Sequence, residues 1–582
     1  MSKPSGHKRS PQKQASAKSA PSSTETGAGP DQASMVKWSG WILLGITALV
    51  FLQARIKLLA IPLERDEGVF AYMGHWMLRG RELYTQMIDS KLPGLYAYYG
   101  LFTSLFGFNA TGVHMGLLVA NVVSAVALYY FARSMYNHLV AAIATSFFLF
   151  MVISPSMVGF AAHATQLLTP FLMLGILLFW NALRSGKKVT FLVAGLMIGI
   201  AFTIKQQAAI FGILLAIMWW PARLRWYKKP EGRLPILEWM LLGIGGLLPL
   251  ACIVTYYGAV GHLDELYNWT VTQPFSLAGS YRDPKIKLFL NILPQVIDHF
   301  EAVWLLATAG LVFVFMSGYK RESAWFAVSC GILGVLSVII GAAYYPHYFV
   351  LAIPGIAILA ACALYWLSLK INKYGTVAAI TIAAILLILS MRGNSDYFFR
   401  PNYAKIHFET YNRNMFPEME LIGKELGRRV PEGERIGILG SEPEILVAAN
   451  RESCSRYLMI YAILTNPVLS PPMQEEFVQN IKDCYPEYIV FNPLSSSWAP
   501  GYDKLQFFLD FMPWVEEHYT AVGMAESFED RPGVIVWDEA LKNHRAQSNY
   551  QIIVLQRKDK IPPPPPEPVM PPPGSFIDIK PM

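Results

Sequence analysis

A series of long apolar segments is the feature that most constrains how this chain can fold. Each segment is close to the roughly 20 residues that a helix needs to cross the hydrocarbon core of a bilayer. Charged residues make up only 15% of the 582 residues, and hydrophobic residues make up 53%, whereas a soluble protein has about 25% charged residues. The sequence therefore predicts a polytopic α-helical membrane protein with about eleven transmembrane helices. The expected spans fall at about 38–54, 112–132, 139–154, 166–183, 189–204, 207–220, 236–257, 301–318, 324–343, 348–368 and 375–391.

The charges of the loops predict how these helices are oriented. Lys and Arg concentrate in cytoplasmic loops, and the short expected outer loops near 155–165 and 344–347 carry neither. Residues 1–36 are basic and almost free of aliphatic side chains, so we predict a disordered cytoplasmic tail. We expect a multi-pass protein of the plasma (inner) membrane whose last span ends outside. The expected inner loops carry Arg133, Arg184, Lys187, Lys188, Arg223, Arg225, Lys228, Lys229, Arg233, Lys320, Arg321, Lys370 and Lys373.

Two expected outer loops, 61–100 and 258–300, break this charge rule. Charges beside membrane spans are energetically costly, so their presence indicates function. We therefore predict that 61–100 holds the chemistry, and that Arg65 and Arg282 are candidate substrate-binding residues. The charged residues of 61–100 include Arg65, Asp66, Glu67, Arg79, Arg81, Asp89 and Lys91, and those of 258–300 include Arg282, Lys285 and Lys287.

The pair Asp66-Glu67 directly follows the first span. Adjacent residues cannot line the same face of a helix, so we expect the two carboxylates to do different jobs. One could act as general base on an acceptor hydroxyl, which requires it within hydrogen-bond reach of that proton. The alternative is that the pair caps the start of a helix, where acidic side chains are favoured.

Basic residues and aromatic residues gather at several other outer boundaries. Lys91 precedes Pro93, which suits the first position of a helix, and a helix N-terminus with a lysine can bind phosphate. Lys205 lies between two apolar halves, either at a simple turn or in a polar cavity. Further candidates, each either a phosphate or substrate ligand or merely interfacial, are His347 and Tyr348 in YYPHYF and, with a weaker case, His163 and Gln166.

Arg55 and Lys57 close the first expected span at its outer end. Long basic side chains at such a position either snorkel toward water or contact an anionic lipid headgroup. The sequence leaves both interpretations open.

Residues 392–556 are more polar and predict a small extracytoplasmic α/β domain. Strands are expected at Glu434–Leu439, Tyr488–Phe491 and Val534–Trp537, and helices near 417–429 and 471–483. Cys454 and Cys484 of this domain either pair as a disulfide or stay free. Residues 557–582 contain PPPPPEPVMPPP and form an extended Pro-rich tail.

Several function classes lack their motifs. The chain has no G-x-G-x-x-G or P-loop pattern, so no nucleotide site is assigned. It also lacks H-E-x-x-H and G-x-S-x-G, which removes support for zinc-protease and serine-hydrolase functions. No basic patch interleaved with aromatic residues indicates nucleic acid as a partner.

These features together resemble a known superfamily. An acidic outer-loop pair, a Lys-x-Pro before an aromatic helix, a Tyr/His cluster before a late span and an outer C-terminal domain are similar to GT-C glycosyltransferases. The resemblance is to the protein O-mannosyltransferase type, which includes the bacterial lipid A aminoarabinose transferase, and it covers roughly residues 38–391 within a membrane domain at 37–391. One departure is Lys91-Leu92-Pro93-Gly94, where the family often has Lys-Pro-Pro.

The resemblance implies an integral-membrane, mannosyltransferase-like enzyme that transfers a hexosyl or pentosyl group from a polyprenyl-phosphate-linked donor. The acceptor would be an extracytoplasmic protein, lipid or cell-envelope glycan, and transfer would invert the donor carbon. By this resemblance, Asp66 matches the general base of the family and Glu67 is its neighbour. Lys91 matches a residue near the donor phosphate. His347 and Tyr348 match residues of a late loop that contact the donor or its phosphate. Membrane lipids are the remaining partners. The lipid phosphate carries its own activation, so we expect no cofactor, and two adjacent carboxylates do not suffice to predict a metal site.

Two other functions remain open from the sequence. A flippase or transporter of lipid-linked glycans would share the spans and charges, but it should show internal repeats, and no clear repeat is present. An oligosaccharide ligase or polymerase would place its key residues in a later outer loop, where Arg282 would be decisive.

Overall fold

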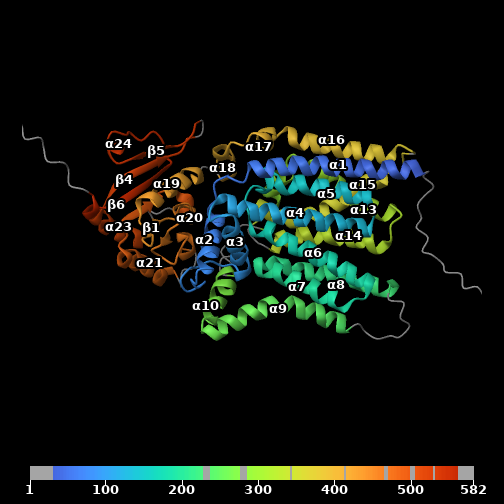
Figure 1. Cartoon of the computed structure of the whole chain (residues 1–582), viewed down its shortest axis with the longest axis horizontal. Coiled ribbons are helices and arrows are strands. Elements are labelled where there is room, and N and C mark those ends of the chain that lie inside the picture. Colours follow the sequence, from blue (N-terminus) through green and yellow to red (C-terminus); the bar gives the residue numbers. More distant parts are fainter. Residues whose placement is uncertain are drawn as a thin grey trace, which may run out of the picture.

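The computed structural model describes residues 30–226, 236–275, 285–340, 344–371, 373–411, 414–464, 470–498, 505–528 and 531–561. Its membrane helices lie side by side along the long axis of the molecule, and a domain with a β-sheet caps one end of them (Figure 1). Arg282 and residues 562–582 of the Pro-rich tail lie outside the described residues.

A helix occupies each of the expected spans. Among the described residues, seven helices are long and apolar enough to cross a membrane. The helices α12 and α13 pass the same test together but bend by 115° relative to one another, so they form either one broken span or a re-entrant loop. Three shorter apolar helices, His138–Ile153, Lys188–Ile204 and Gln206–Met218, match the remaining expected spans. The polytopic helical fold class is confirmed. The helices are α1 (Pro30–Lys57), α4 (Ala110–Met135), α5 (His138–Ile153), α6 (Ala164–Ser185), α7 (Lys188–Ile204), η2 (Gln206–Ala209), α8 (Ile210–Trp226), α9 (Ile236–Val260), α12 (Lys285–Ile297), α13 (Glu301–Met316), α14 (Arg321–Ile340), η4 (Pro346–Ala352), α15 (Ile353–Ser368) and α16 (Gly375–Arg392).

The first helix differs from the expectation in two ways. It begins at Pro30, so residues 30–36, which we expected in the disordered tail, are helical. Arg55 near its end is fully buried, at 0% exposure, whereas Lys57 is exposed. Arg55 therefore neither snorkels nor reaches lipid, because its guanidinium is enclosed by neighbouring helices.

The loop 61–100 folds into two helices at the end of the bundle, between the membrane helices and the C-terminal domain (Figure 1). These are α2 (Arg65–Met77) and α3 (Pro93–Phe106), with Pro93 at the first helical turn as the sequence predicts. Glycines let α2 approach both neighbours. A Cβ at Gly74 would lie 2.6 Å from the amide nitrogen of Gly100 in α3, and one at Gly68 would lie 2.6 Å from that of Glu444.

The C-terminal domain is built on a six-stranded mixed sheet with the order β2-β1-β3-β6-β4-β5. The expected strands appear as β1 (Arg435–Leu439), β3 (Tyr488–Phe491) and β5 (Val534–Trp537), and the parallel pairs are β1 with β2 and with β3. Antiparallel pairing joins β3, β6, β4 and β5. The other elements are α17 (Ser395–Phe399), α18 (Tyr403–Tyr411), α19 (Phe416–Arg429), α20 (Pro443–Ala449), β2 (Glu452–Ser453), η5 (Ile460–Ile463), α21 (Ser470–Cys484), α22 (Ser495–Trp498), α23 (Gln506–His518), β4 (Tyr519–Glu526), α24 (Glu539–Lys542), β6 (Gln551–Arg557) and η7 (Lys558–Lys560).

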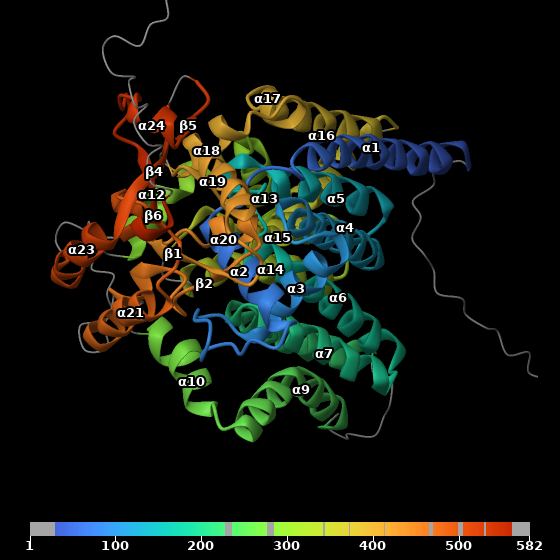
Figure 2. The same ribbon diagram turned by 60° about the vertical axis from the view of Figure 1, so that its left-hand side comes forward.

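Figure 2 shows α19 and α20 between this sheet and the membrane bundle, and α21 and α23 farther from the bundle. The strands β4 and β6 were not expected from the sequence, since Tyr519–Glu526 and Gln551–Arg557 mix polar and apolar residues along their length. β6 ends at Arg557 and η7 ends at Lys560, so regular structure extends four residues into the segment that we expected to be tail.

Cys454 and Cys484 form a disulfide, which decides the alternative that the sequence left open. The bond ties the end of β2 to the end of α21, across a sequence separation of 30 residues. Closing a loop of this size stabilises a fold by about 3–4 kcal/mol.

We expect the double variant Cys454→Ser/Cys484→Ser to unfold in its C-terminal domain at a lower temperature than the wild type. Thermal unfolding of the solubilised full chain, with and without reductant, measures this. Cys252→Ser is the control, because Cys252 is a free, exposed thiol of α9. A wild-type melting temperature that reductant leaves unchanged would contradict the prediction.

Candidate functional site

The start of α2 is fixed by a reciprocal pair of hydrogen bonds. Glu64 is the N-cap, and its side chain accepts from the Glu67 amide at 2.9 Å. The Glu67 carboxylate in turn accepts from the Glu64 amide at 3.2 Å. Such a capping box satisfies backbone donors that have no partner within the helix, so it sets where α2 begins and how its first turn is rotated.

Glu67 also joins this turn to two other parts of the membrane domain. Its Oε1 lies 3.0 Å from Nε2 of His114 in α4 and accepts a hydrogen bond of 2.6 Å from the Ala162 amide. Burial acts to raise the pKa of Glu67, but His114 and the Ala162 amide outweigh burial, and the pKa falls below its ordinary value. Glu67 is therefore a buried, fully bonded carboxylate at 1% exposure.

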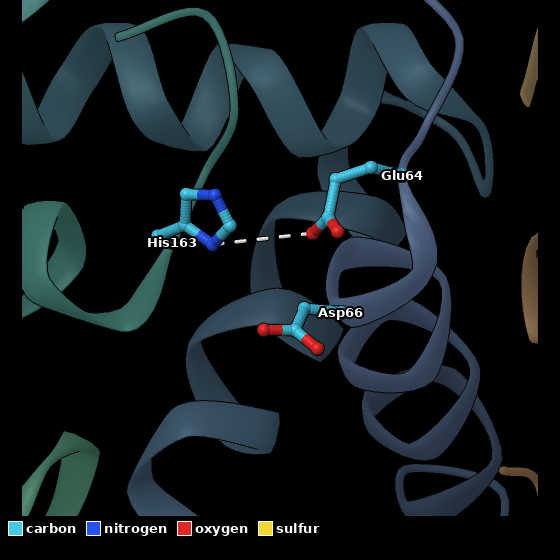
Figure 3. A group of neighbouring side chains, drawn as sticks. All are labelled: Glu64, Asp66 and His163. Atoms are coloured by element: carbon cyan, nitrogen blue, oxygen red, sulfur yellow. Dashed lines mark ion pairs between the residues drawn. The ribbon is translucent and has the colours of Figure 1, made fainter. Parts of the chain in front are cut away.

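Asp66, its neighbour, is different. Its side chain is half-buried, and within the described part of the chain its carboxylate accepts no hydrogen bond and forms no ion pair. It points from α2 toward Glu64 and His163, as Figure 3 shows. Ligand atoms of these three residues lie within 4.8 Å of one another, so Asp66 has the open position that a reactive carboxylate needs.

Glu64 and His163 are both buried beside it. Nδ1 of His163 lies 3.9 Å from Oε1 of Glu64 (Figure 3), and Nε2 has no hydrogen-bond partner among the described residues. Burial raises the pKa of Glu64 well above its ordinary value, and the carboxylates of Asp66 and Glu67 add to this effect. Burial also lowers the pKa of His163. One imidazole and two carboxylates at this spacing are a set that could hold a divalent cation.

His347 reaches the same place from η4. Its ring stacks on the ring of His163, with centroids 3.7 Å apart and planes at 12°. The Thr165 hydroxyl donates to the His347 carbonyl at 2.8 Å, which holds η4 against the start of α6. The structure thus unites two histidines that lie far apart in the sequence.

Two basic residues, Lys91 and Lys205, lie close enough to this group to interact electrostatically with His347. Lys205 is buried at 8% exposure, between α7 and η2, and it interacts electrostatically with both Lys91 and Asp66. Gly94 explains how the two lysines come together. A Cβ at Gly94 would lie 2.2 Å from the Thr203 hydroxyl oxygen, so α3 can begin against the end of α7 only with glycine there.

Tyr348 supports Lys205. The Lys205 amine lies 3.6 Å from the centroid of the Tyr348 ring, a cation–π contact in a desolvated position. Lys205 therefore lies at the break between α7 and η2, as the turn interpretation predicts, but its side chain is buried there. Its signal in the sequence was the lysine between two short apolar halves.

The loop that carries His163 is held by a polar network that the sequence did not reveal. Arg55 donates to the Gly159 carbonyl at 2.8 Å and to the side-chain oxygen of Asn121. Asn121 donates to Gln166 at 3.0 Å. All these side chains are buried, and only the apolar context of Arg55 and Asn121 in the sequence could have indicated the network.

Arg65 points the other way, into the C-terminal domain. Its guanidinium donates to the Ser441 and Ser496 carbonyls at 2.6 and 3.0 Å and to the Glu442 carboxylate at 3.2 Å. These contacts suit docking of that domain. The same domain brings Tyr461 of η5 within electrostatic range of Asp66, and burial raises the Tyr461 pKa well above its ordinary value.

Comparisons with known proteins agree with this architecture. Residues 91–252, less than half of the chain, match the family model described as dolichyl-phosphate-mannose-protein mannosyltransferase. No curated protein matches the chain by sequence.

Solved structures share the fold. ArnT from Cupriavidus metallidurans bound to undecaprenyl phosphate is 14% identical with a TM-score of 0.55, covering 89% of this chain and 98% of that one. The same protein in the apo state is 15% identical with a TM-score of 0.52, covering 86% of this chain and 98% of that one. The archaeal oligosaccharyltransferase AglB from Archaeoglobus fulgidus was solved in complex with an inhibitory peptide and a dolichol-phosphate. It is 11% identical with a TM-score of 0.50, covering 87% of this chain and 75% of that one. At these identities the likeness establishes the fold.

The chain is a multi-pass membrane protein with the fold of the GT-C glycosyltransferases. This is the fold that the sequence resemblance predicted, and one segment of the chain also matches the mannosyltransferase family model. The matched segment includes Lys91, His163 and Lys205, whereas Asp66 precedes it.

We expect the two adjacent carboxylates to differ in their effect on stability. In Glu67→Gln the new amide group turns a donor toward either the Glu64 amide or the Ala162 amide, which should lower the free energy of unfolding by about 1–3 kcal/mol. Asp66→Asn should leave it close to wild type, because its carboxylate has no partner to lose. Thermal unfolding of both variants in detergent measures the difference, and equal melting temperatures would contradict the assigned contacts.

Proposed function

We propose that this protein transfers a sugar from a polyprenyl-phosphate-linked donor to an extracytoplasmic acceptor, with Asp66 as the general base. The observation that carries the proposal is that Lys205 interacts electrostatically with both Lys91 and Asp66, and that the Asp66 carboxylate has no hydrogen-bond or ion-pair partner among the described residues. A base for a hydroxyl and cations for a phosphate are the two requirements of this reaction. The family match and the lipid phosphates bound to ArnT and AglB support a lipid-linked donor.

In the proposed reaction the acceptor hydroxyl oxygen attacks the anomeric carbon of the donor sugar. The bond between that carbon and the phosphate oxygen breaks, and the electron pair leaves with the polyprenyl phosphate. The hydroxyl proton passes to the Asp66 carboxylate. Attack from the face opposite the phosphate inverts the configuration of the donor carbon.

The two lysines of the site, Lys91 and Lys205, stabilise the leaving group. A phosphodiester carries one negative charge, and the departing phosphate monoester gains a second, so fixed cations stabilise the transition state more than the bound donor. Lys91 and Lys205 supply these charges. Tyr348 holds the Lys205 amine and His347 packs on His163, so both late-loop residues shape the site.

The remaining predicted residues position this machinery. Glu67 fixes the first turn of α2 through His114 and Ala162. Arg65 docks the C-terminal domain through Ser441 and Glu442, one residue before Asp66, which supports a role for that domain in admitting the acceptor. We propose a cytoplasmic N-terminus and an extracytoplasmic C-terminal domain, since the loop charges favour that orientation.

We predict that Asp66→Asn abolishes transfer while the protein still inserts and folds. Removing a positioned general base lowers the rate by about 10²–10⁴-fold. Mass spectrometry of cell-envelope glycans and glycoproteins, from cells lacking the protein and complemented with wild type or Asp66→Asn, identifies the lost sugar and its acceptor. The assignment of Asp66 is wrong if the variant restores that sugar at a normal rate.

A second pair of variants tests the donor side. Lys205→Met and Lys91→Met should each lower kcat/KM for an undecaprenyl-phosphate sugar by about 10²-fold, because each removes a charge that faces the departing phosphate. Lys187→Met is the matched control, since Lys187 is an exposed lysine at the opposite end of α7. Unchanged kinetics in both site variants would exclude the lysines from phosphate binding.

A further inference from the structure

A shallow pocket of about 610 Å³ lies at the end of α1 that faces the C-terminal domain. It is formed between the last turn of α1 and the chain that links α17 to α18. Figures 1 and 2 both show α1 beside α16 at one edge of the bundle, with α17 continuing from α16. The pocket shares no residue with the site around Asp66.

Two hydrogen bonds build its polar wall. The Lys57 amine donates to the Phe399 carbonyl, and the Tyr403 hydroxyl donates to the Lys57 carbonyl at 2.6 Å. An ammonium has three donors, so Lys57 keeps others for a ligand. The bond to Phe399 holds the Lys57 amine at the pocket, and the bond from Tyr403 holds the start of α18 against the end of α1.

The charge of the pocket is positive. Arg400 is the second cation of the lining and is exposed, and within the described residues its guanidinium makes no ion pair or hydrogen bond. No Asp or Glu lines the pocket. Two cations and a phenol around a shallow opening are complementary to a phosphate group.

The position of the pocket indicates where that phosphate comes from. Lys57 is the last residue of the membrane span Trp38–Lys57. Ile56, also in the lining, is 59% exposed at the end of this span, where an apolar side chain suits contact with the acyl chains of a bilayer. Tyr403 has the amphipathic ring that is enriched at membrane boundaries. A phosphate bound here would therefore belong to a molecule whose tail lies beside Ile56.

We propose that this pocket binds the phosphate headgroup of an anionic phospholipid in the leaflet on the side of the C-terminal domain. Lys57 and Arg400 contact the phosphate, and an acyl chain lies along Ile56 of α1. Because Lys57 belongs to the first span and Arg400 to the chain leading to the C-terminal domain, the lipid bridges the two. The bound lipid should then stabilise the attachment of that domain.

The test uses the purified full-length chain, delipidated in neutral detergent and titrated with phosphatidylglycerol, with phosphatidylcholine as the uncharged comparison. Native mass spectrometry counts bound lipid, and thermal unfolding reports the stabilisation. We expect Lys57→Gln/Arg400→Gln to bind phosphatidylglycerol about tenfold more weakly than wild type, because the variant loses charge-assisted hydrogen bonds to the phosphate. Lys405→Gln/Lys424→Gln is the control, because these lysines of α18 and α19 pair with Glu409 and Glu420 outside the pocket.

Arg400→Gln alone keeps the hydrogen bond of Lys57 to Phe399, so it separates ligand binding from folding. Equal phosphatidylglycerol binding by wild type and both pocket variants would overturn the proposal. Inorganic phosphate that competes as well as the lipid would overturn the lipid source. Preferential binding of undecaprenyl phosphate would instead assign the pocket to the donor carrier. Loss of phosphatidylglycerol binding in the pocket variants alone supports the proposal.

Discussion

The buried carboxylate of Glu67 is the interaction on which the rest of this site depends. It accepts from the amide of Glu64, from the amide of Ala162 and from the imidazole of His114. These groups belong to the entrance of α2, to the loop before α6 and to α4, which the sequence separates by up to about a hundred residues. A buried charge is stable only when its acceptor sites are filled. The hydrogen bonds of the Glu67 carboxylate therefore join these segments and fix the position of Asp66 relative to His163.

A second constraint acts on Lys91 and Lys205, the two basic residues of the site. Lys91 precedes α3 and Lys205 follows α7, so both lie at the ends of helices whose separation depends on side-chain size at the crossing. Gly94 has no Cβ to collide with Thr203, and α3 can therefore start directly against the end of α7. The order Lys91-Leu92-Pro93-Gly94 thus has a structural reason in this chain. It keeps the proline that starts α3 and allows the closer approach.

The sequence could predict the parts of this protein that local patterns determine. The spans follow from the length of the apolar runs, the start of α3 from Pro93, and the candidate residues Asp66 and Lys91 from charges placed beside the membrane. The partners of those residues could not be predicted in the same way. Arg55 reaches Gly159 and Asn121, and His163 reaches His347, through contacts that only the packing of distant helices creates. The strands β4 and β6 were missed because their mixed composition lacks a regular alternation of apolar residues.

The first turn of α2 shows why one short segment can serve three neighbours at once. Successive residues of an α-helix point about 100° apart, since each turn holds 3.6 residues. Arg65 therefore faces the C-terminal domain, Asp66 faces Glu64 and His163 (Figure 3), and Glu67 faces α4. Asp66 also interacts electrostatically with Lys205. The docking contact and the reactive carboxylate are adjacent in the chain and share one rigid turn. Any movement of the C-terminal domain that rotates α2 through Arg65 must also turn Asp66 relative to Lys91 and Lys205, so docking of the domain and geometry of the site are mechanically coupled.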